Sequence, residues 1–508
     1  MDNDDWSVVI QAHREVAIST FLCLNQLKCL HEAYYTSFIE LSGRCSVCSS
    51  DLQRLPVALV KSTINAWKKS ISNNFPPGPR PLPLIGNLHL INLKRPQKTF
   101  VELSKKYGSV FSIQLGMKKM VVLAGYETVK DALVHHGSEF GERAHVPIFE
   151  DINNGFVFYR CSFCTWRKME KNEKIHPSHA GKPFDITEIM NFAVANIIIS
   201  IVLGHRFDYD HPRLLMVTQL VTENLRLIGS PMVNLYNLFP ALYFLPGNHK
   251  TVHQNIKDIH SFLRKTFLAS RNELKSEEKR NFIEAFLIKE KEEKTNPNSY
   301  FHDENLLCVV TSLFTAGTDT TSATLRWGCL LMMKFPDIQR KVQEEIDRVI
   351  GLEQPNTVHR KLMPYTDAVL HEVQRFGNIL PLGLPRETTV DTNFKGFFIP
   401  KGTHIIPLLE SVLYDKSQFA TPEEFNPQHF LDSDGKFVKN EALMNFGAGR
   451  RICIGETLAR MELFLFFTSL LQKCTLRLPP GVTHTDFTPA VGFTTPPKPY
   501  EICALPRC

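Results

Sequence analysis

The stretch Phe446-Gly447-Ala448-Gly449-Arg450-Arg451-Ile452-Cys453-Ile454-Gly455 decides the fold, and it runs directly into the apolar segment 456–463. Glycines on both sides of a single cysteine allow the backbone to approach a flat ligand closely. The cysteine precedes a predicted helix and follows two arginines, so we expect its thiol to be shifted toward the thiolate. A thiolate is a strong ligand for iron, and the loop therefore predicts an iron site at Cys453.

A lone cysteine is more often a small buried hydrophobic residue than a ligand. A pattern of five fixed positions argues against that alternative here: Phe446, Gly449, Arg451, Cys453 and Gly455. An axial thiolate pushes electron density onto haem iron and favours cleavage of the O–O bond. The loop therefore indicates the proximal ligand site of a haem-thiolate oxygenase.

Two upstream stretches accompany this loop. The segment Glu372-Val373-Gln374-Arg375 places an acid and an arginine on one face of a predicted helix, and the stretch 75–87 is rich in proline. Together with the cysteine loop, these motifs resemble the cytochrome P-450 family, and in detail the vertebrate family 2 microsomal group. The resemblance implies that Glu372, Arg375 and His429 form a structural cluster, with histidine where many members carry arginine.

The resemblance covers residues from about 75 to the C-terminus and implies a mainly α fold of the α+β kind. We expect an atypical N-terminal segment at 1–74 and a catalytic domain at 75–508. Its small β-rich part would comprise about 75–140 plus 384–410, and the remainder would form the large helical, haem-binding part. A chain of 508 residues exceeds the size at which a single hydrophobic core stops growing, which fits two packed parts.

The haem contacts that the resemblance implies come from several parts of the chain. Arginines suit bidentate binding of the haem propionates. One expected contact departs from the family pattern, because Glu170 stands where a Trp-x-x-x-Arg helix would carry its arginine, and the chain is short between that point and Gly181. The expected contacts are Arg143, Trp166, Ala316, Arg386, Phe446, Arg451, Cys453 and Gly455, with Arg167 as a candidate substitute for the missing arginine.

A long apolar periodicity after Asp303 predicts a helix that continues to Pro336, and its middle carries Ala316-Gly317-Thr318-Asp319-Thr320-Thr321. These are poor helix formers, so we expect a local widening with hydroxyl groups that bond back to the preceding turn. A kink that serves packing alone is the alternative. By resemblance, Asp319 and Thr320 are the acid and alcohol that relay protons during oxygen activation. The expected substrate pocket is apolar and includes Phe314, Leu384 and Phe493.

Two alternating segments, 110–115 and 119–123, bracket Gly116 and predict a β-hairpin. Segments 397–400 and 404–407 are predicted to join this hairpin in one small sheet.

The composition excludes some function classes. The formal net charge of +6 comes from scattered lysines and arginines, and no arginine-rich block or aromatic-interleaved basic stripe occurs. Nucleic-acid binding is therefore not expected. We expect instead a basic face that contacts an acidic partner or an anionic membrane. The 12 cysteines show no compact disulfide framework, which favours a reducing, cytosol-facing compartment.

Two Cys-x-x-Cys pairs raise the alternative of a zinc site. The pairs lie far apart in the sequence and lack nearby His or Asp partners, so free thiols are the prediction. Their members are Cys45, Cys48, Cys161 and Cys164.

The N-terminus departs from the microsomal pattern. Residues 1–74 contain no uncharged apolar run near the roughly 18 residues that a membrane span requires. Either another reading has replaced the anchor segment, or the protein attaches peripherally or is soluble. By resemblance alone, the expected location is the cytosolic face of the endoplasmic reticulum membrane.

The resemblance implies a monooxygenase that uses NADPH-derived electrons to insert one atom of O2 into a lipophilic substrate, either a fatty acid or a foreign compound. The expected cofactor is haem b, and the expected partners are NADPH-cytochrome P-450 reductase and cytochrome b5. Candidate docking residues are Lys341, Lys439 and Arg450. Two alternatives stay open: a haem-thiolate isomerase or dehydratase, against which Thr320 argues, and an inactive product caused by the shortened region after Trp166.

Overall fold

The computed structural model describes residues 74–153, 181–274, 281–297, 299–483 and 485–507. The chain divides into two compact units, Met1–Phe75 and Pro76–Cys508, and the helices and strands below belong to the second. Several sequence predictions lie outside the described residues: the N-terminal segment 1–73, Trp166, Arg167, Glu170 and both Cys-x-x-Cys pairs. They stay predictions.

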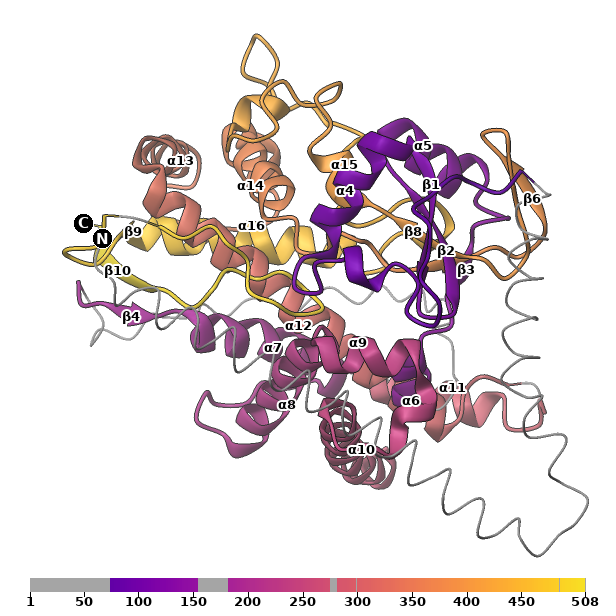
Figure 1. Ribbon diagram of the computed structural model, residues 1–508. Coiled ribbons are helices and arrows are strands. Elements are labelled where there is room, and N and C mark those ends of the chain that lie inside the picture. Colours follow the sequence, from indigo (N-terminus) through magenta and orange to yellow (C-terminus); the bar gives the residue numbers. More distant parts are fainter. Residues whose placement is uncertain (1–73, 154–180, 275–280, 298, 484, 508) are drawn as a thin grey trace, which may run out of the picture. The chain divides into compact units, whose positions relative to one another are not determined.

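The larger sheet joins strands from both halves of the sequence in the order β1-β2-β8-β5-β3. Strands β1 (Val110–Leu115) and β2 (Lys118–Leu123) form an antiparallel hairpin, and β8 (His404–Pro407) runs parallel to β2. Because β8 pairs with β2, the orange strand β8 lies beside the indigo hairpin in Figure 1. Strand β5 (Arg386–Glu387) pairs with β8 and with β3 (Glu142–Arg143).

The hairpin over 110–123 is thus confirmed, and so is the pairing of 404–407 with it. The prediction that 397–400 joins the same sheet is wrong. Strand β7 (Phe397–Ile399) pairs only with β6 (Thr392–Phe394) in a separate two-stranded sheet. The reason is the turn at Lys395 and Gly396, whose positive φ angles of 49° and 83° favour a tight hairpin between adjacent segments.

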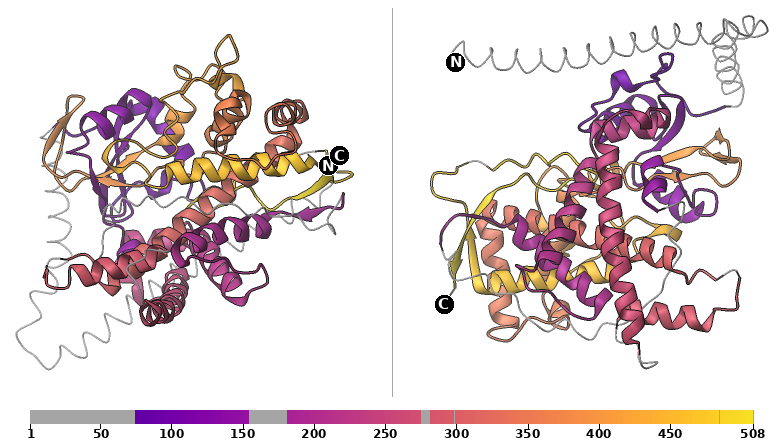
Figure 2. Two further views of the ribbon diagram at one scale, coloured as in Figure 1. Left: turned by 180° about the vertical axis from the view of Figure 1, so that it is seen from behind. Right: turned by 90° about the horizontal axis from the view of Figure 1, so that it is seen from below.

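The centre of the helical part is α12 (Asp303–Lys334), a helix of 32 residues whose predicted extent is confirmed. It begins at His302, whose side chain accepts a hydrogen bond from the Asn305 N–H, and it ends before Pro336. Helix α12 packs against the helices α7 (Thr187–Leu203), α8 (Pro212–Ile228), α14 (Pro364–Gly377) and α16 (Glu456–Lys473). Figure 2 shows α12 and α16 from behind and from below.

The remaining elements surround these. Helices near the sheet and the cysteine loop are η1 (Leu88–Leu90), α4 (Pro96–Tyr107), α5 (Tyr126–Lys130), η2 (Asp131–His135), α15 (Leu409–Leu413) and η7 (Gly449–Arg451). The others are α6 (Pro147–Asn153), α9 (Pro231–Leu238), η4 (Pro240–Phe244), α10 (Asn248–Glu273), α11 (Phe282–Glu292), α13 (Pro336–Val349), η5 (His359–Leu362) and η6 (Pro427–Phe430). Helix α6 packs against α9 and α10, and η6 packs against α14. A three-stranded sheet has the order β4-β10-β9, with β4 (Phe184–Asp185), β9 (Cys474–Arg477) and β10 (Glu501–Pro506).

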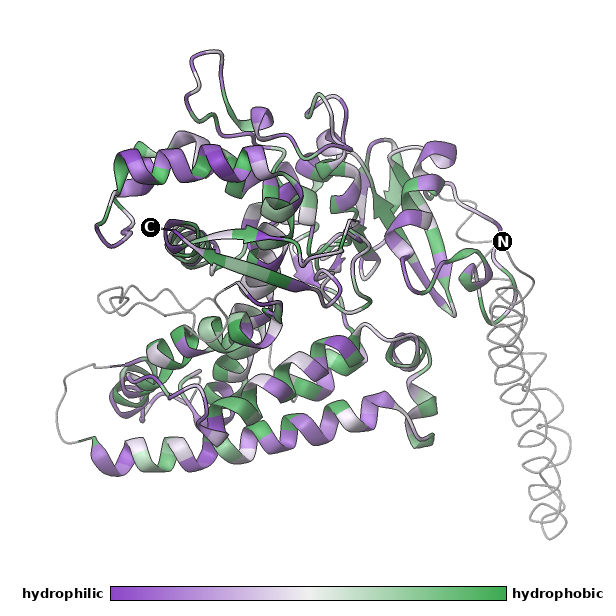
Figure 3. Cartoon of the chain, turned by 90° about the vertical axis from the view of Figure 1, so that its left-hand side faces the viewer, coloured by the Kyte–Doolittle hydropathy of each residue, from purple (hydrophilic) through white to green (hydrophobic). Residues whose placement is uncertain are grey.

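Surface helices are mixed in colour in Figure 3 because one face of each is polar and the other is buried. In α13, for example, Val342 and Ile346 are fully buried while Arg340 and Lys341 are exposed. Within the described ranges, none of the helices combines the length and the apolar character needed to cross a bilayer.

Candidate active site

The cysteine loop is held by its own backbone. The Cys453 N–H donates to the Phe446 carbonyl at 2.9 Å, and Gly455 is the first residue before α16. Gly449 has a φ of +68°, and a Cβ at this position would lie 1.7 Å from the carbonyl oxygen of Leu133 in η2. Any side chain at 449 would therefore push the loop off η2. The sequence predicted that the glycines allow close approach to a flat ligand. At Gly449 the close approach is instead to the backbone of η2.

Cys453 is solvent-accessible, although the surrounding protein removes much of the water from around its thiol. Burial raises the pKa of its thiol, and the Gly455 N–H and the charge of Arg143 oppose that rise without cancelling it. The prediction that the loop by itself lowers the thiol pKa is therefore wrong, because desolvation outweighs the helix terminus and the arginines. Coordination to a cation would still deprotonate the thiol.

Three arginines converge beside this cysteine. Arg143 and Arg386 are directly opposite each other in the β3–β5 pair, and an Nη of Arg386 lies 3.5 Å from the carbonyl oxygen of Arg451. Burial, together with Arg143 and Arg451, lowers the pKa of Arg386 to about 9. Burial and Arg451 likewise lower the pKa of Arg143 to about 10. The chain thus holds positive charges together at a cost, which indicates a site for anions.

The hydrogen bonding of these arginines supports the same conclusion. Among the described residues, Nη1 of Arg143 and Nε of Arg386 are buried without a hydrogen-bond partner. Arg451 is different, because it donates to the Gly141 carbonyl at 2.9 Å and forms an ion pair with Glu142 at 3.2 Å. Buried guanidinium donors without protein acceptors suit the two propionates of a haem whose iron is bound by Cys453. The donor set therefore fits haem.

The middle of α12 contributes an accessible stretch to this region. Ala316 is exposed although most of the helix around it is buried. The Thr320 hydroxyl donates to the Ala316 carbonyl at 2.7 Å, as the sequence predicted for hydroxyl groups at this place. The predicted local widening is absent, because the α-helix continues without interruption from Ala316 through Thr321. A Cβ at Gly317 would lie 2.7 Å from Cδ1 of Ile198, so this glycine serves close packing of α7 on α12.

Asp319 is buried and accepts a hydrogen bond from the Thr494 hydroxyl at 2.6 Å. Burial raises the pKa of its carboxyl, against the effects of Thr494 and Arg326. Asp319 and Thr320 are adjacent on α12, but Asp319 faces the C-terminal segment while Thr320 bonds along its own helix. Thr494 belongs to no sequence motif and lies 175 positions after Asp319, so the sequence did not predict this contact. In this segment the sequence pointed only to the neighbouring residue, Phe493, as part of the pocket.

Two of the three predicted pocket residues lie in one apolar cluster. Phe314 is buried there and Phe493 packs at its edge, with its ring centroid 5.4 Å from that of Phe149. Leu384 is half-buried and belongs to none of the described apolar clusters.

The predicted structural cluster is complete. Arg375 donates to both carboxylate oxygens of Glu372 at 2.7 Å and to the carbonyls of three more residues. His429 lies 3.2 Å from the same carboxylate through Nδ1. The three accepting carbonyls are those of Leu413, Pro422 and Glu424.

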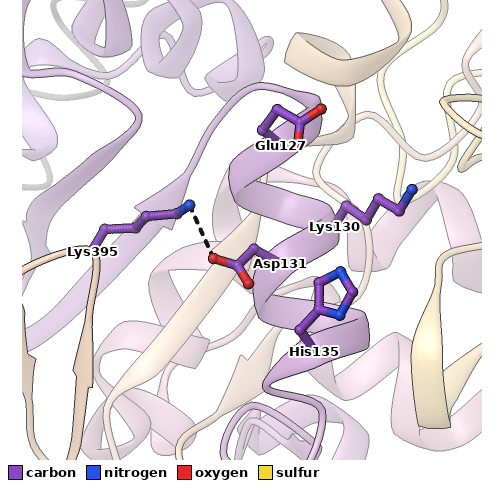
Figure 4. Close-up of a pocket in the computed structure, with 5 residues that line it drawn as sticks. All are labelled: Glu127, Lys130, Asp131, His135 and Lys395. Atoms are coloured by element: carbon purple, nitrogen blue, oxygen red, sulfur yellow. Dashed lines mark ion pairs between the residues drawn. The ribbon is translucent and has the colours of Figure 1, made fainter.

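A surface pocket lies on the outer side of α5 and η2 (Figure 4). Its lining is polar and includes an ion pair between Lys395 and Asp131 at 3.0 Å. It contains none of the predicted site residues, and its charges do not suit a lipophilic substrate. The candidate docking residues Lys341, Lys439 and Arg450 are all exposed.

Comparison with known proteins agrees with this geometry. The family model described as Cytochrome P-450 matches residues 76–176 and 170–504. Cytochrome P-450 2K4 of Oncorhynchus mykiss is 46% identical over 462 residues, which is 85% of this chain and 92% of that protein. Cytochrome P-450 2K6 of Danio rerio is 45% identical, covering 84% and 90% of the two chains. Cytochrome P-450 2F5 of Gorilla gorilla gorilla is 42% identical, covering 85% and 94%.

A thiol in a glycine-bounded loop, unsatisfied arginines beside it and a central helix with an accessible alcohol thus occur in a chain that matches this family over most of its length. The chain belongs to the cytochrome P-450 family of haem-binding monooxygenases.

Proposed function

We propose that this monooxygenase inserts one oxygen atom into a lipophilic small molecule, a fatty acid or a foreign compound, with electrons that originate from NADPH. The observation that carries the proposal is the group of buried arginine nitrogens without protein acceptors beside an accessible cysteine. Haem bound here would supply an iron that activates O2. The chain's own residues would bind it, exclude water and deliver protons.

Cys453 would be the iron ligand, and its loop is rigid because Gly449 allows direct packing on η2. Arg143 and Arg386 would donate to the propionates, and Arg451 would share its guanidinium between a propionate and Glu142. Each propionate would remove part of the repulsion between these arginines. Haem binding and the stability of this region are therefore coupled.

Asp319 and Thr320 of α12 would hold and move protons. Burial raises the pKa of the Asp319 carboxyl, which favours its protonated form, and the Thr320 hydroxyl can both accept and donate a proton. This pair supports oxygen insertion over the isomerase or dehydratase alternative, which needs no proton delivery of this kind. Phe314 and Phe493 lie in an apolar cluster and would favour a lipophilic substrate.

The redox partner would be NADPH-cytochrome P-450 reductase, with cytochrome b5 as a second donor. Lys341, Lys439 and Arg450 are exposed, as docking to an acidic patch requires. By similarity to the family 2 relatives, we place the protein at the cytosolic face of the endoplasmic reticulum membrane.

The test is the carbon monoxide difference spectrum of the reduced protein, followed by NADPH-dependent turnover of dodecanoic acid and 7-ethoxycoumarin with reductase. Cys453→Ala should lose the thiolate-type Soret shift, whereas the control Cys308→Ala, at a buried cysteine of α12, should keep it. A normal shift in Cys453→Ala would refute the ligand assignment. Retained haem and a normal shift without any reductase-dependent oxidation would favour the alternatives.

A further inference from the structure

Three consecutive side chains of α12 face three different partners. Asp319 accepts from Thr494, Thr320 donates to the Ala316 carbonyl, and Thr321 is hydrogen-bonded to Glu462 of α16. Only the first of these contacts links the proposed proton relay to a segment that also carries a pocket residue. That segment is 493–497.

The contact between Thr494 and Asp319 is well enclosed. Asp319 is 9% exposed and Thr494 is 3% exposed, and the hydroxyl-to-carboxylate distance is 2.6 Å. Inside a protein, where water cannot replace a lost donor, the orientation of a carboxyl group follows the donors that the chain provides. In the described part of the structure, Thr494 is the side chain that donates to the Asp319 carboxylate, whereas the Ser322 hydroxyl donates to the Asp319 backbone carbonyl.

The chain on both sides of Thr494 is anchored. The Phe493 N–H donates to the Leu225 carbonyl at 3.0 Å, and the Trp327 indole donates to the Thr495 carbonyl at 3.1 Å. The Thr495 hydroxyl donates to the Asn378 carbonyl at 2.9 Å. The position of the Thr494 hydroxyl is therefore set jointly by α8, by α12 through Trp327 and by the end of α14, so a movement of Phe493 will be felt at Asp319.

We infer that Thr494 is a positioning residue for the proton relay: its hydroxyl sets the direction of the Asp319 carboxyl and connects that direction to the substrate side through Phe493. The inference rests on the proposed function and deepens it. Without the donor, the Asp319 carboxyl turns, proton delivery becomes less efficient, and more of the NADPH consumed ends in hydrogen peroxide. Substrate affinity is not expected to change in parallel, because Thr494 itself is buried away from solvent.

Three variants of the holoenzyme test this role with 7-ethoxycoumarin as the probe substrate. Thr494→Val keeps the shape and removes the donor, and Thr494→Ser keeps the donor. Thr495→Val is the matched control, because it removes a neighbouring hydroxyl that bonds to Asn378 and not to the acid. Thr494→Val should lower the ratio of product to NADPH several-fold, with KM within about twofold of the parent and full haem content. Thr494→Ser and Thr495→Val should match the parent.

Three results would overturn the role. The first is that Thr494→Val leaves both the product-to-NADPH ratio and KM unchanged. The second is a raised KM with an unchanged ratio, which would make Thr494 a pocket residue. Equal losses in Thr494→Val and Thr495→Val would also overturn it, since they would indicate a general structural effect.

Urea unfolding of the haem-free chain separates the contact from the activity. Thr494→Val should shift the unfolding midpoint in the parent and should produce no such shift in an Asp319→Ala background. Equal shifts in both backgrounds would show that the hydroxyl does not act on Asp319. A parent protein that binds haem but oxidises no lipophilic probe refutes the proposed function and the relay role together, while the unfolding cycle still decides whether Thr494 acts on the acid.

Discussion

Arg375 and Arg386 are both buried arginines, but the chain satisfies only one of them. Arg375 is fully buried, and its five N–H donors meet two carboxylate oxygens and three carbonyls. Arg386 is 4% exposed, its Nε has no partner among the described residues, and two other arginines lie near it. The first cluster is complete within the protein, and the second becomes complete only when an anion binds.

The charge balance of the first cluster explains why it needs nothing further. The Thr421 N–H donates to Nε2 of His429 at 3.2 Å, so the proton of a neutral imidazole lies on Nδ1 and faces Glu372. Glu372 and Arg375 then balance each other. A histidine at 429 thus completes the cluster without adding a charge, whereas an arginine there would add one.

The largest expected effect comes from breaking the satisfied cluster. Arg375→Leu leaves Glu372 buried without its main partner, which should cost about 3–5 kcal/mol in the free energy of unfolding. Urea unfolding measures it. The matched control is Arg340→Leu, which removes an arginine from an exposed pair with the same spacing on α13 and should cost less than about 1 kcal/mol. Equal losses in the two variants would contradict the comparison.

A buried acid extends the comparison to negative charge. Glu462 is 1% exposed, its Oε1 has no partner in the described part of the chain, and burial raises the pKa of its carboxyl to about 8. Because the folded-state pKa lies above the unfolded value, stability is full below about pH 4.5 and falls as pH rises toward 8. At about 1.4 kcal/mol per pKa unit, the loss at alkaline pH should approach roughly 5 kcal/mol.

Glu462→Gln should remove this part of the pH dependence, and unfolding measured between pH 5 and pH 9 would detect the change. Glu501→Gln, at an exposed position, is the control and should follow the parent. A Glu462→Gln curve parallel to that of the parent would mean that the carboxyl is not protonated in the folded chain.

Removing Arg386 should have opposite effects on the two states of the protein. Arg386→Met relieves repulsion, so the haem-free chain should unfold at the same or a higher urea concentration. The haem affinity should fall roughly 10- to 100-fold, since a charged hydrogen bond contributes about 1.5–3 kcal/mol. Titration with haem and urea unfolding of the haem-free chain give the two values. A loss of stability without haem would place Arg386 in the same class as Arg375.

The smallest expected effect is at His429. His429→Asn removes a neutral hydrogen bond while Arg375 and the Asn426 N–H still donate to Glu372. The cost should be about 1 kcal/mol in urea unfolding. A loss as large as that of Arg375→Leu would mean that the imidazole carries a charge in this cluster.

The sequence predicted the elements whose signals are local. The helix around Asp319, the hairpin before Leu123 and the pairing of Glu372 with Arg375 follow from spacing along one segment. The sequence did not predict the contacts between distant segments, such as Leu133 with Gly449 or Asp319 with Thr494, because nothing in either segment encodes its partner. The family resemblance predicted the three arginines as haem contacts. Only the structure shows that Arg451 has an acidic partner, whereas Arg143 and Arg386 each keep a buried nitrogen without one among the described residues.

Two of the predictions made from the sequence are wrong for the same physical reason. The expected low thiol pKa at Cys453 and the expected widening around Gly317 were both inferred from neighbouring residues in the sequence, and in both places the surrounding protein decides the outcome. Burial outweighs the positive charges near the thiol, and the packing of Ile198 explains the glycine in a continuous helix.

The parallel pairing of β2 with β8 has a consequence for how the protein is made. The Gly125 N–H, just after β2, donates to the Ser411 hydroxyl, 286 positions later in the chain. At about 5–20 residues per second, a ribosome needs roughly 15–60 s to synthesise that length. During this interval the β1–β2 hairpin exposes an unpaired edge and apolar side chains. Such an edge is prone to pair with other chains, so the risk of aggregation persists until β8 has been synthesised.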